Sequence, residues 1–145
     1  MPASCRIASL IPSGLIVESE TRGDDEICLV VRAAAGMVVC PLCASPSRRI
    51  HSRYMRRVSD LPCSGRSVRL HIVTRRFCCE ASDCPRRIFA ERFDEAVLPV
   101  RSRRTARLEG LVHHLGLALG GRPAASFAKR LMLPVSNDTL LRVVR

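Results

Sequence analysis

Apolar and polar residues alternate in the middle of the chain. From residue 68 to residue 72 every second position is apolar and the positions between are basic, and Val73 then interrupts the alternation. This period of two predicts a half-buried β-strand with a basic outer face. The apolar face carries Val68, Leu70 and Ile72, and the outer face carries Arg69, His71 and Arg75.

Further strands are predicted on the N-terminal side. Residues 15–21 and 26–33 are rich in β-branched and aliphatic side chains and are separated by a polar Gly-containing turn, which predicts a hairpin. A segment around residues 48–57 is expected to form a strand with Ile50 and Tyr54 facing inward and its arginines facing outward. Residues 60–65 have the composition of a turn.

Helical periodicity replaces the alternation after residues 98–100, which we interpret as a linker. A first amphipathic helix is predicted to end at Gly120-Gly121, a second to begin at Pro123, and a third to begin after Ser136 as N-cap. The inward positions of the first helix are Leu108, Leu111, Val112, Leu115 and Leu119, those of the second are Ala124, Phe127, Ala128 and Leu131, and those of the third are Leu140, Val143 and Val144.

These patterns predict an α+β protein made of a zinc-ribbon-like β module followed by a three-helix helix-turn-helix module. The expected divisions are an N-terminal segment with a β-hairpin (residues 1–36), a zinc-binding β module (37–93) and a helix-turn-helix module (101–145). An aromatic content of 3% with no Trp argues against one large, well-filled core in this chain of 145 residues.

The net charge of +11 indicates what kind of partner the protein could bind. Residues 101–145 carry nine basic residues against two acidic ones, and residues 37–99 carry twelve against six. Such a field attracts polyanions, of which nucleic acid is the commonest, although a solvated basic surface is the simpler interpretation. Arginine suits phosphate oxygens and base edges, but a GC-rich genome would also enrich it.

Two pairs of cysteines provide the candidate chemistry. Cys40 and Cys43 are separated by two residues, and Cys79 and Cys84 by four. Two such pairs can complete a tetrahedral shell of four thiolates around one structural Zn²⁺. Cys78 competes with Cys79 as the third ligand.

The other candidate ligands lack a partner at this short spacing. We therefore expect Cys5, Cys28 and Cys63 to be core or surface thiols, and His51 to be hydrogen-bonded or exposed.

The cysteines also bear on where the protein works. No stretch is long and apolar enough for a membrane span, and the segment around residues 10–17 is too short for a signal peptide. A cytoplasmic protein should keep its thiols reduced, which favours metal ligation over disulfides. A thiol redox enzyme using Cys40 and Cys43 is an alternative, but the βαβ context of such a motif is missing.

The second and third predicted helices have the size of a helix-turn-helix, with the third as recognition helix. The alternative is an ordinary three-helix bundle with a solvated polar face. Candidate DNA contacts on the helices are Asn137, Thr139, Arg142 and Arg145 for the third helix, with Arg122 and Arg130 as phosphate contacts. Arg53, Arg56 and Arg57 of the β module would add a sequence-independent contact.

Several motifs in order resemble the N-terminal part of bacterial insertion-sequence transposases of the ISL-three group. The motifs are Cys40-Pro41-x-Cys43, Ser47-Arg48-Arg49-Ile50-His51-Ser52-Arg53-Tyr54, Asp60-Leu61-Pro62, Arg75-Arg76-Phe77-x-Cys79, Cys84-Pro85-Arg86-Arg87-x-Phe89-Ala90-Glu91, Gly120-Gly121 and Ser136-x-Asp138-Thr139-Leu140-Leu141-Arg142. The resemblance implies a zinc finger and a helix-turn-helix that bind double-stranded DNA at terminal inverted repeats, followed by a catalytic domain with Asp, Asp and Glu.

The chain departs from that family in two places. Cys63 stands where the family often has an aromatic residue, and the chain stops at Arg145, where the catalytic domain would follow. We therefore expect a non-enzymatic protein that recognises insertion-sequence ends. The sequence leaves self-association open. The alternative function is a zinc-dependent protein-interaction or oligomerisation module.

Overall fold

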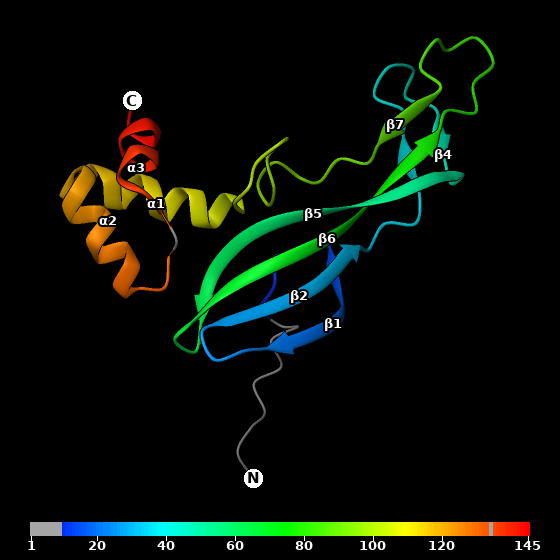
Figure 1. Cartoon of the computed structure of the whole chain (residues 1–145). Coiled ribbons are helices and arrows are strands. Elements are labelled where there is room, and N and C mark those ends of the chain that lie inside the picture. The colour runs from blue at the N-terminus through cyan, green and yellow to red at the C-terminus, as the bar shows by residue number, and fades with distance from the viewer. Residues whose placement is uncertain (1–9, 134) are drawn as a thin grey trace.

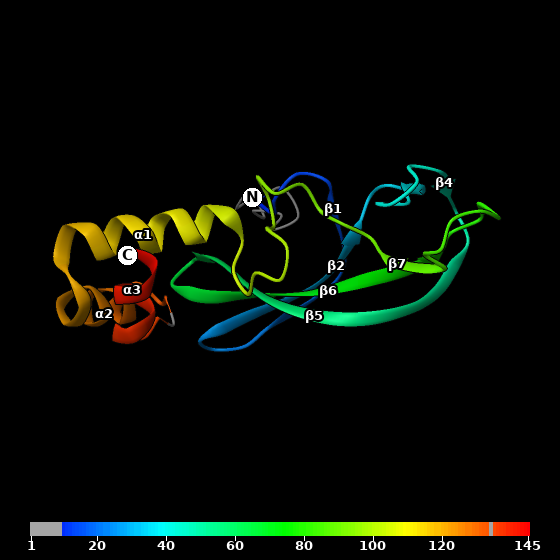
Figure 2. The same cartoon turned by 90° about the horizontal axis from the view of Figure 1, so that it is seen from above.

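A computed structural model describes residues 10–133 and 135–145, and shows an elongated molecule with its helices at one end and its cysteine-bearing loops at the other (Figure 1). A long, curved hairpin of two strands, β5 and β6, runs between the two ends (Figure 2). Cys5, and Pro134 in the turn of the expected helix-turn-helix, lie outside the described residues.

The main sheet has the strand order β1-β2-β6-β5, and β7 also pairs with β6. Strand β2 is antiparallel to β1 but parallel to β6, while β5 is antiparallel to β6. The strands are β1 (Leu15–Arg22), β2 (Glu26–Ala33), β5 (Ile50–Cys63), β6 (Arg66–Cys78) and β7 (Ile88–Ala90), with a separate two-stranded sheet of β3 (Val38–Val39) and β4 (Pro46–Ser47). The predicted N-terminal hairpin is confirmed, and it shares one sheet with the long hairpin.

Strand β6 contributes to two separate apolar clusters from its two faces. Along its first part the even positions from 68 to 74 are buried. Its apolar residues there, up to Ile72, pack in the core of the sheet with Leu29 of β2. Towards its end the buried position is Phe77, which faces the opposite side because successive residues of a strand alternate. Phe77 packs with Phe89 and three cysteines in a second cluster. The predicted alternation is confirmed, and the change of buried face was not expected.

The predicted turn at residues 60–65 is wrong for most of its length. Strand β5 continues to Cys63, and only Ser64 and Gly65, both with positive φ, make the turn. Asp60 pairs with Val68 and Cys63 with Arg66, with a register shift between them. Pro62 lies within this irregular stretch of an edge strand, where its missing N–H costs no ladder bond.

The segment expected as a linker packs closely against the sheet. Leu98 is only 2% exposed and belongs to the core of the sheet. Farther on, the backbone N–H of Ser59 donates to Arg103 O at 2.9 Å, and Thr105 N–H donates back to Ser59 O at 3.0 Å. The helices are therefore attached to β5 by a short β-bridge, and whether residues 101–145 fold independently stays a prediction.

The helices are α1 (Ala106–Leu119), α2 (Gly121–Arg130) and α3 (Asn137–Val143). Thr105 and Ser136 cap α1 and α3 with their side-chain oxygens, which confirms Ser136 as N-cap. Gly120, with φ 71°, ends α1, and Gly121 already begins α2, two residues before Pro123. The three helices enclose a core of Leu108, Val112, Ala124, Ala128, Leu133 and Leu140.

Some predicted inward positions are wrong. In α1, Leu111 and Leu119 are exposed while Gly116 is buried. In α2, Phe127 is 46% exposed and Leu131 just after the helix is 40% exposed, because the close approach of the helices is made by the small residues Ala124 and Ala128. The periodicity of apolar residues correctly predicted the helices, but it predicted wider buried faces than the structure shows.

The described residues thus form an α+β structure with a sheet-rich part followed by three helices. The helix-turn-helix interpretation stays a prediction. Among the helices of residues 10–133 and 135–145, none is both long and apolar enough to cross a membrane.

Candidate metal centre and nucleic-acid interface

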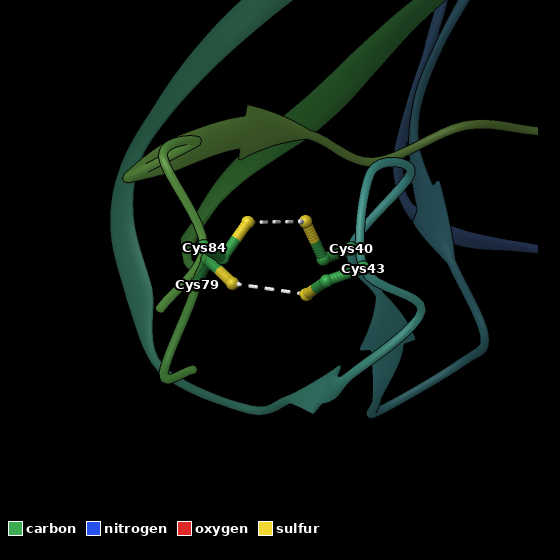
Figure 3. A group of neighbouring side chains, drawn as sticks. All are labelled: Cys40, Cys43, Cys79 and Cys84. Carbon is green, nitrogen blue, oxygen red and sulfur yellow. Dashed lines mark hydrogen bonds between the residues drawn. The ribbon is translucent and has the colours of Figure 1, made fainter. Parts of the chain in front are cut away.

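The first pair of cysteines lies in a tight turn between β3 and β4. Cys40 N–H donates to Ser45 O at 2.9 Å, and Ala44 N–H donates to Cys40 O at 2.8 Å. Ala44 closes the turn with φ 59°, in the left-handed region. This turn brings the side chains of Cys40 and Cys43 to one side of the loop (Figure 3).

The second pair lies in the loop between β6 and β7. Cys79 N–H donates to Arg87 O at 2.8 Å and Cys84 N–H donates to Ala81 O at 3.3 Å, so the backbone bonds fold the four-residue gap into a compact loop. Ser47 supports the approach of the two loops from the side: its hydroxyl is 2.6 Å from Cys78 O. Ser47 is 2% exposed, and in the sequence it was identified only as part of a motif, without this contact.

The two loops face each other through their sulfur atoms (Figure 3). The Sγ atoms of Cys40 and Cys84 are 4.0 Å apart, those of Cys43 and Cys79 are 3.5 Å apart, and all four lie within 4.8 Å of one another. Four thiolates bound tetrahedrally at a Zn–S distance of about 2.3 Å would be separated by about 3.8 Å. The arrangement therefore fits one structural zinc ion.

The electrostatics of the four thiols are uneven. Hydrogen bonds from the side chain and backbone of Ser45 lower the pKa of Cys43 to about 6. At Cys79 the Ala81 N–H favours the thiolate, but burial and hydrogen bonds to the neighbouring thiols outweigh it and raise the pKa to about 12. Four crowded sulfurs cannot all ionise without a cation among them, and a divalent metal supplies that charge.

The remaining candidate ligands lie outside the four-sulfur group. Cys78 is half-buried beside Cys79 but is not among the four clustered sulfurs, and Cys28 and Cys63 are also half-buried, free thiols elsewhere on the main sheet. His51 is exposed, with its ring nitrogen near the Ser52 hydroxyl. The seven cysteines of the described residues are all unbridged.

The three candidate arginines of the β module are not equivalent. Arg57 pairs with His71 on the open face of the sheet, and Arg53 is also exposed. Arg56 pairs with Ile72, which is fully buried, so it points to the opposite face. There its guanidinium donates to Ser102 O at 2.9 Å and holds the segment before α1.

The basic outer face predicted for β6 is also reduced by ion pairing. Arg75 donates to Glu91 at 2.7 Å, and both side chains are largely buried. Arg69 pairs with Glu26 at 2.8 Å at the surface, and this bond lowers the pKa of Glu26. The outer face thus keeps Arg53 and Arg57 as arginines without an ion pair to the described residues.

Residues of α3 differ in how available they are. Arg142 and Arg145 are exposed, as are Arg122 and Arg130 of α2. The Thr139 hydroxyl is 3.0 Å from Ser136 Oγ, and Asn137 is only partly accessible, with a buried Oδ1 that lies against Gly121.

A buried carboxylate, Asp60, connects the sheet to the helices. In the sequence, Asp60 was identified only as part of the Asp60-Leu61-Pro62 motif, and these contacts were not predicted. Its side chain is 2% exposed and accepts from the Thr105 hydroxyl at 2.7 Å and from Arg107 Nε at 2.8 Å. The bond to Asp60 raises the pKa of Arg107. Asp60 has no metal-ligating neighbours among the described residues, and its role is to orient α1 on the sheet.

Comparison with known proteins identifies one part of the chain. Residues 37–84 match the family described as the zinc-finger of transposase IS204/IS1001/IS1096/IS1165. No curated protein and no solved structure gave a significant match. The matched segment begins just before the first cysteine pair and ends at Cys84, so it contains all four clustered thiols.

Proposed function

We propose that the protein binds double-stranded DNA at insertion-sequence ends, as the DNA-recognition part of a transposase. The observation that carries the proposal is the match of residues 37–84 to a transposase zinc finger, over the segment whose four thiols fit one zinc. The ligands would be Cys40, Cys43, Cys79 and Cys84. A bound zinc would cross-link the two loops and leave catalysis to other parts of a transposase.

The distribution of ion pairs supports a polyanionic partner. Acidic side chains in the described residues pair with arginines that hold the fold together, such as Arg75 and Arg107. Among the residues that the structure describes, no ion pair includes an arginine that we propose to contact DNA. These arginines are Arg53, Arg57, Arg122, Arg130, Arg142 and Arg145.

Within this proposal, residues 37–93 and 101–145 act as two modules on the same DNA, and α3 reads the bases. Arg142 is the base-reading candidate, because it is exposed and lies in the last turn of α3. Asn137 is the weaker candidate, because its carboxamide oxygen is buried against α2. Arg122 and Arg130 of α2 would meet phosphates.

The test begins with the zinc-loaded protein and a random library of duplex DNA, from which bound sequences are selected. Affinity is then measured for the selected duplex and a scrambled one over a series of salt concentrations. Arg142→Ala should cost about 1–3 kcal/mol on the selected duplex and relax the sequence preference. Lys129→Ala, which removes one exposed charge from α2, is the matched control and should keep the preference. Equal, salt-insensitive affinities of the wild type for both duplexes would contradict the proposal.

A protein-interaction or oligomerisation module is the second candidate function. It is favoured by apolar side chains that the helices leave exposed, notably Leu117 at 61% and Phe127 at 46%. Sedimentation of the wild type and of Leu117→Glu and Phe127→Glu over a range of concentrations distinguishes this candidate. A concentration-dependent assembly that both substitutions abolish would support it, and a monomer at all concentrations would argue against self-association.

A further inference from the structure

A basic groove lies where the segment before α1 meets α3. Its volume is about 670 Å³. The groove is lined by residues 101–104, Glu109, Arg142 and Val143. The acidic residue in this lining, Glu109, is paired with Arg104. Arg101, Arg103 and Arg142 are exposed and appear in no ion pair with the described residues.

Hydrogen bonds hold the backbone of this groove in place. The carbonyl of Ser102 accepts from Arg56 at 2.9 Å, that of Arg103 accepts from Ser59 N–H at 2.9 Å, and that of Arg104 is 2.6 Å from the Ser102 hydroxyl. Three consecutive carbonyls are therefore already bonded within the protein. The groups left to meet a ligand are the guanidinium groups, which donate hydrogen bonds and carry positive charge.

The backbone at Arg101 is unusual. Its φ of 61° lies in the left-handed region, which an arginine rarely adopts and a glycine adopts without strain. A side chain held in such a conformation is a reason to look for function at that position.

The same residue extends the basic surface towards the zinc-binding loops. Arg101 also lines a neighbouring depression of about 330 Å³, together with Arg86 and Arg92 among other residues. Arg86 follows Cys84 closely in the chain, and Arg92 follows β7; both are exposed and in no ion pair with the described residues. Because the two depressions share Arg101, basic side chains follow one another from α3, over residues 101–103, to the cysteine-bearing loops.

We propose that this groove, formed by Arg101 and Arg103 beside Arg142, is a binding site for the phosphate backbone of double-stranded DNA. This inference rests on the proposed function and adds a site through which the two modules would contact one continuous duplex. A duplex fits better than a single strand, because single-strand binding relies on exposed aromatic rings. Among the described residues, no aromatic side chain lines the groove. Phe77 and Phe89 are buried, Arg76 covers the ring of Tyr54, and the exposed Phe127 belongs to α2 and is not part of this lining.

The test compares Arg101→Gln/Arg103→Gln with the wild type in zinc-loaded protein. For both selected and scrambled duplex DNA, the slope of log affinity against log salt should fall by about two, because each phosphate contact contributes about 0.9. The ratio of the two affinities should stay unchanged, since these arginines read no bases. Arg101→Lys/Arg103→Lys should keep the wild-type slope, and Arg103→Gln alone, at a position with ordinary backbone, should lower it by about one.

The charge-matched control is Arg48→Gln/Arg49→Gln, which removes two exposed arginines between β4 and β5. An unchanged slope in the groove variant, or an equal fall in the control, would overturn the inference. If the groove variant lowers the salt slope only for single-stranded DNA of the same length, the assignment to a duplex is overturned. If the wild type binds duplex DNA and Arg142→Ala relaxes its preference while the groove variant keeps the wild-type slope, this inference alone fails. If the wild type does not bind duplex DNA, the proposed function itself fails.

Discussion

The two ends of the β5–β6 hairpin are held together by different chemistry. At one end, β6 packs its even positions against β2 and the segment containing Leu98, in an apolar core that needs no ligand. At the other end, Phe77 and Phe89 pack with Cys40, Cys79 and Cys84, so cysteines make up most of the buried cluster. Val38, Ile50 and Ala81 pack against this cluster but are only partly buried.

One continuous strand, β6, thus contributes to a region whose thiols fit a metal and to a region held by apolar packing alone. The stability of the loops should follow zinc, while the sheet core and the helices should follow apolar burial and the bonds to Asp60. Changes at the two ends should therefore have separable effects, and the following experiments test that separation in order of decreasing effect.

Removing the metal should produce the largest effect. Structural zinc contributes on the order of 10 kcal/mol of apparent binding free energy, so chelation or Cys40→Ser should unfold the cysteine-bearing loops. Hydrogen exchange should become fast at the backbone amides of Cys79 and Cys84, and stay slow at Leu70 in the sheet core. Helical circular dichroism should persist.

The control for metal removal is Cys78→Ser, next to the proposed ligand Cys79 but outside the four-sulfur group. Elemental analysis should still find one equivalent of zinc in this variant. A full equivalent of zinc in Cys79→Ser would instead identify Cys78 as the third ligand. Simultaneous loss of helix on chelation would show that the two ends form one cooperative unit.

Asp60→Asn should produce the next largest effect, because it leaves the Thr105 and Arg107 donors facing a neutral group in a buried site. We expect a loss of about 2–3 kcal/mol in the free energy of unfolding, measured by denaturant titration of the zinc-loaded protein. Glu26→Gln removes an exposed ion pair with Arg69 and should cost less than about 1 kcal/mol. Equal costs for the two variants would mean that Asp60 does not anchor the helices.

Two glycines of α1 should respond with opposite sign to substitution by alanine. A Cβ at Gly116 would lie 2.6 Å from Val144 Cγ1 and 3.3 Å from Leu140 O, so Gly116→Ala should cost about 1–2 kcal/mol by overpacking the helical core. A Cβ at Gly110 meets nothing within 4 Å, and Gly110→Ala should stabilise the helix by up to about 1 kcal/mol. Thermal unfolding followed at a helical wavelength measures both. A stabilising Gly116→Ala would contradict the close packing of α1 on α3.

Features that depend on neighbours in the sequence were predictable from the sequence. The alternation of β6, the hairpin of β1 and β2, and the Ser136 cap follow from residue order, because backbone geometry alone sets which side chains share a face or reach an N–H. The four cysteines were also predictable, because short spacing within each pair and the lack of other pairs leave few combinations.

Contacts between distant segments could not be predicted from the sequence. The parallel pairing of β2 with β6, the burial of Leu98 and the bonds of Asp60 to Thr105 and Arg107 depend on which elements meet, and no local pattern contains that information. Arg56 and Arg57 are adjacent and chemically identical, yet one holds the segment before α1 and the other lies on the open face. Their difference arises because successive side chains of a strand point to opposite faces, and only the packed sheet determines which face is covered.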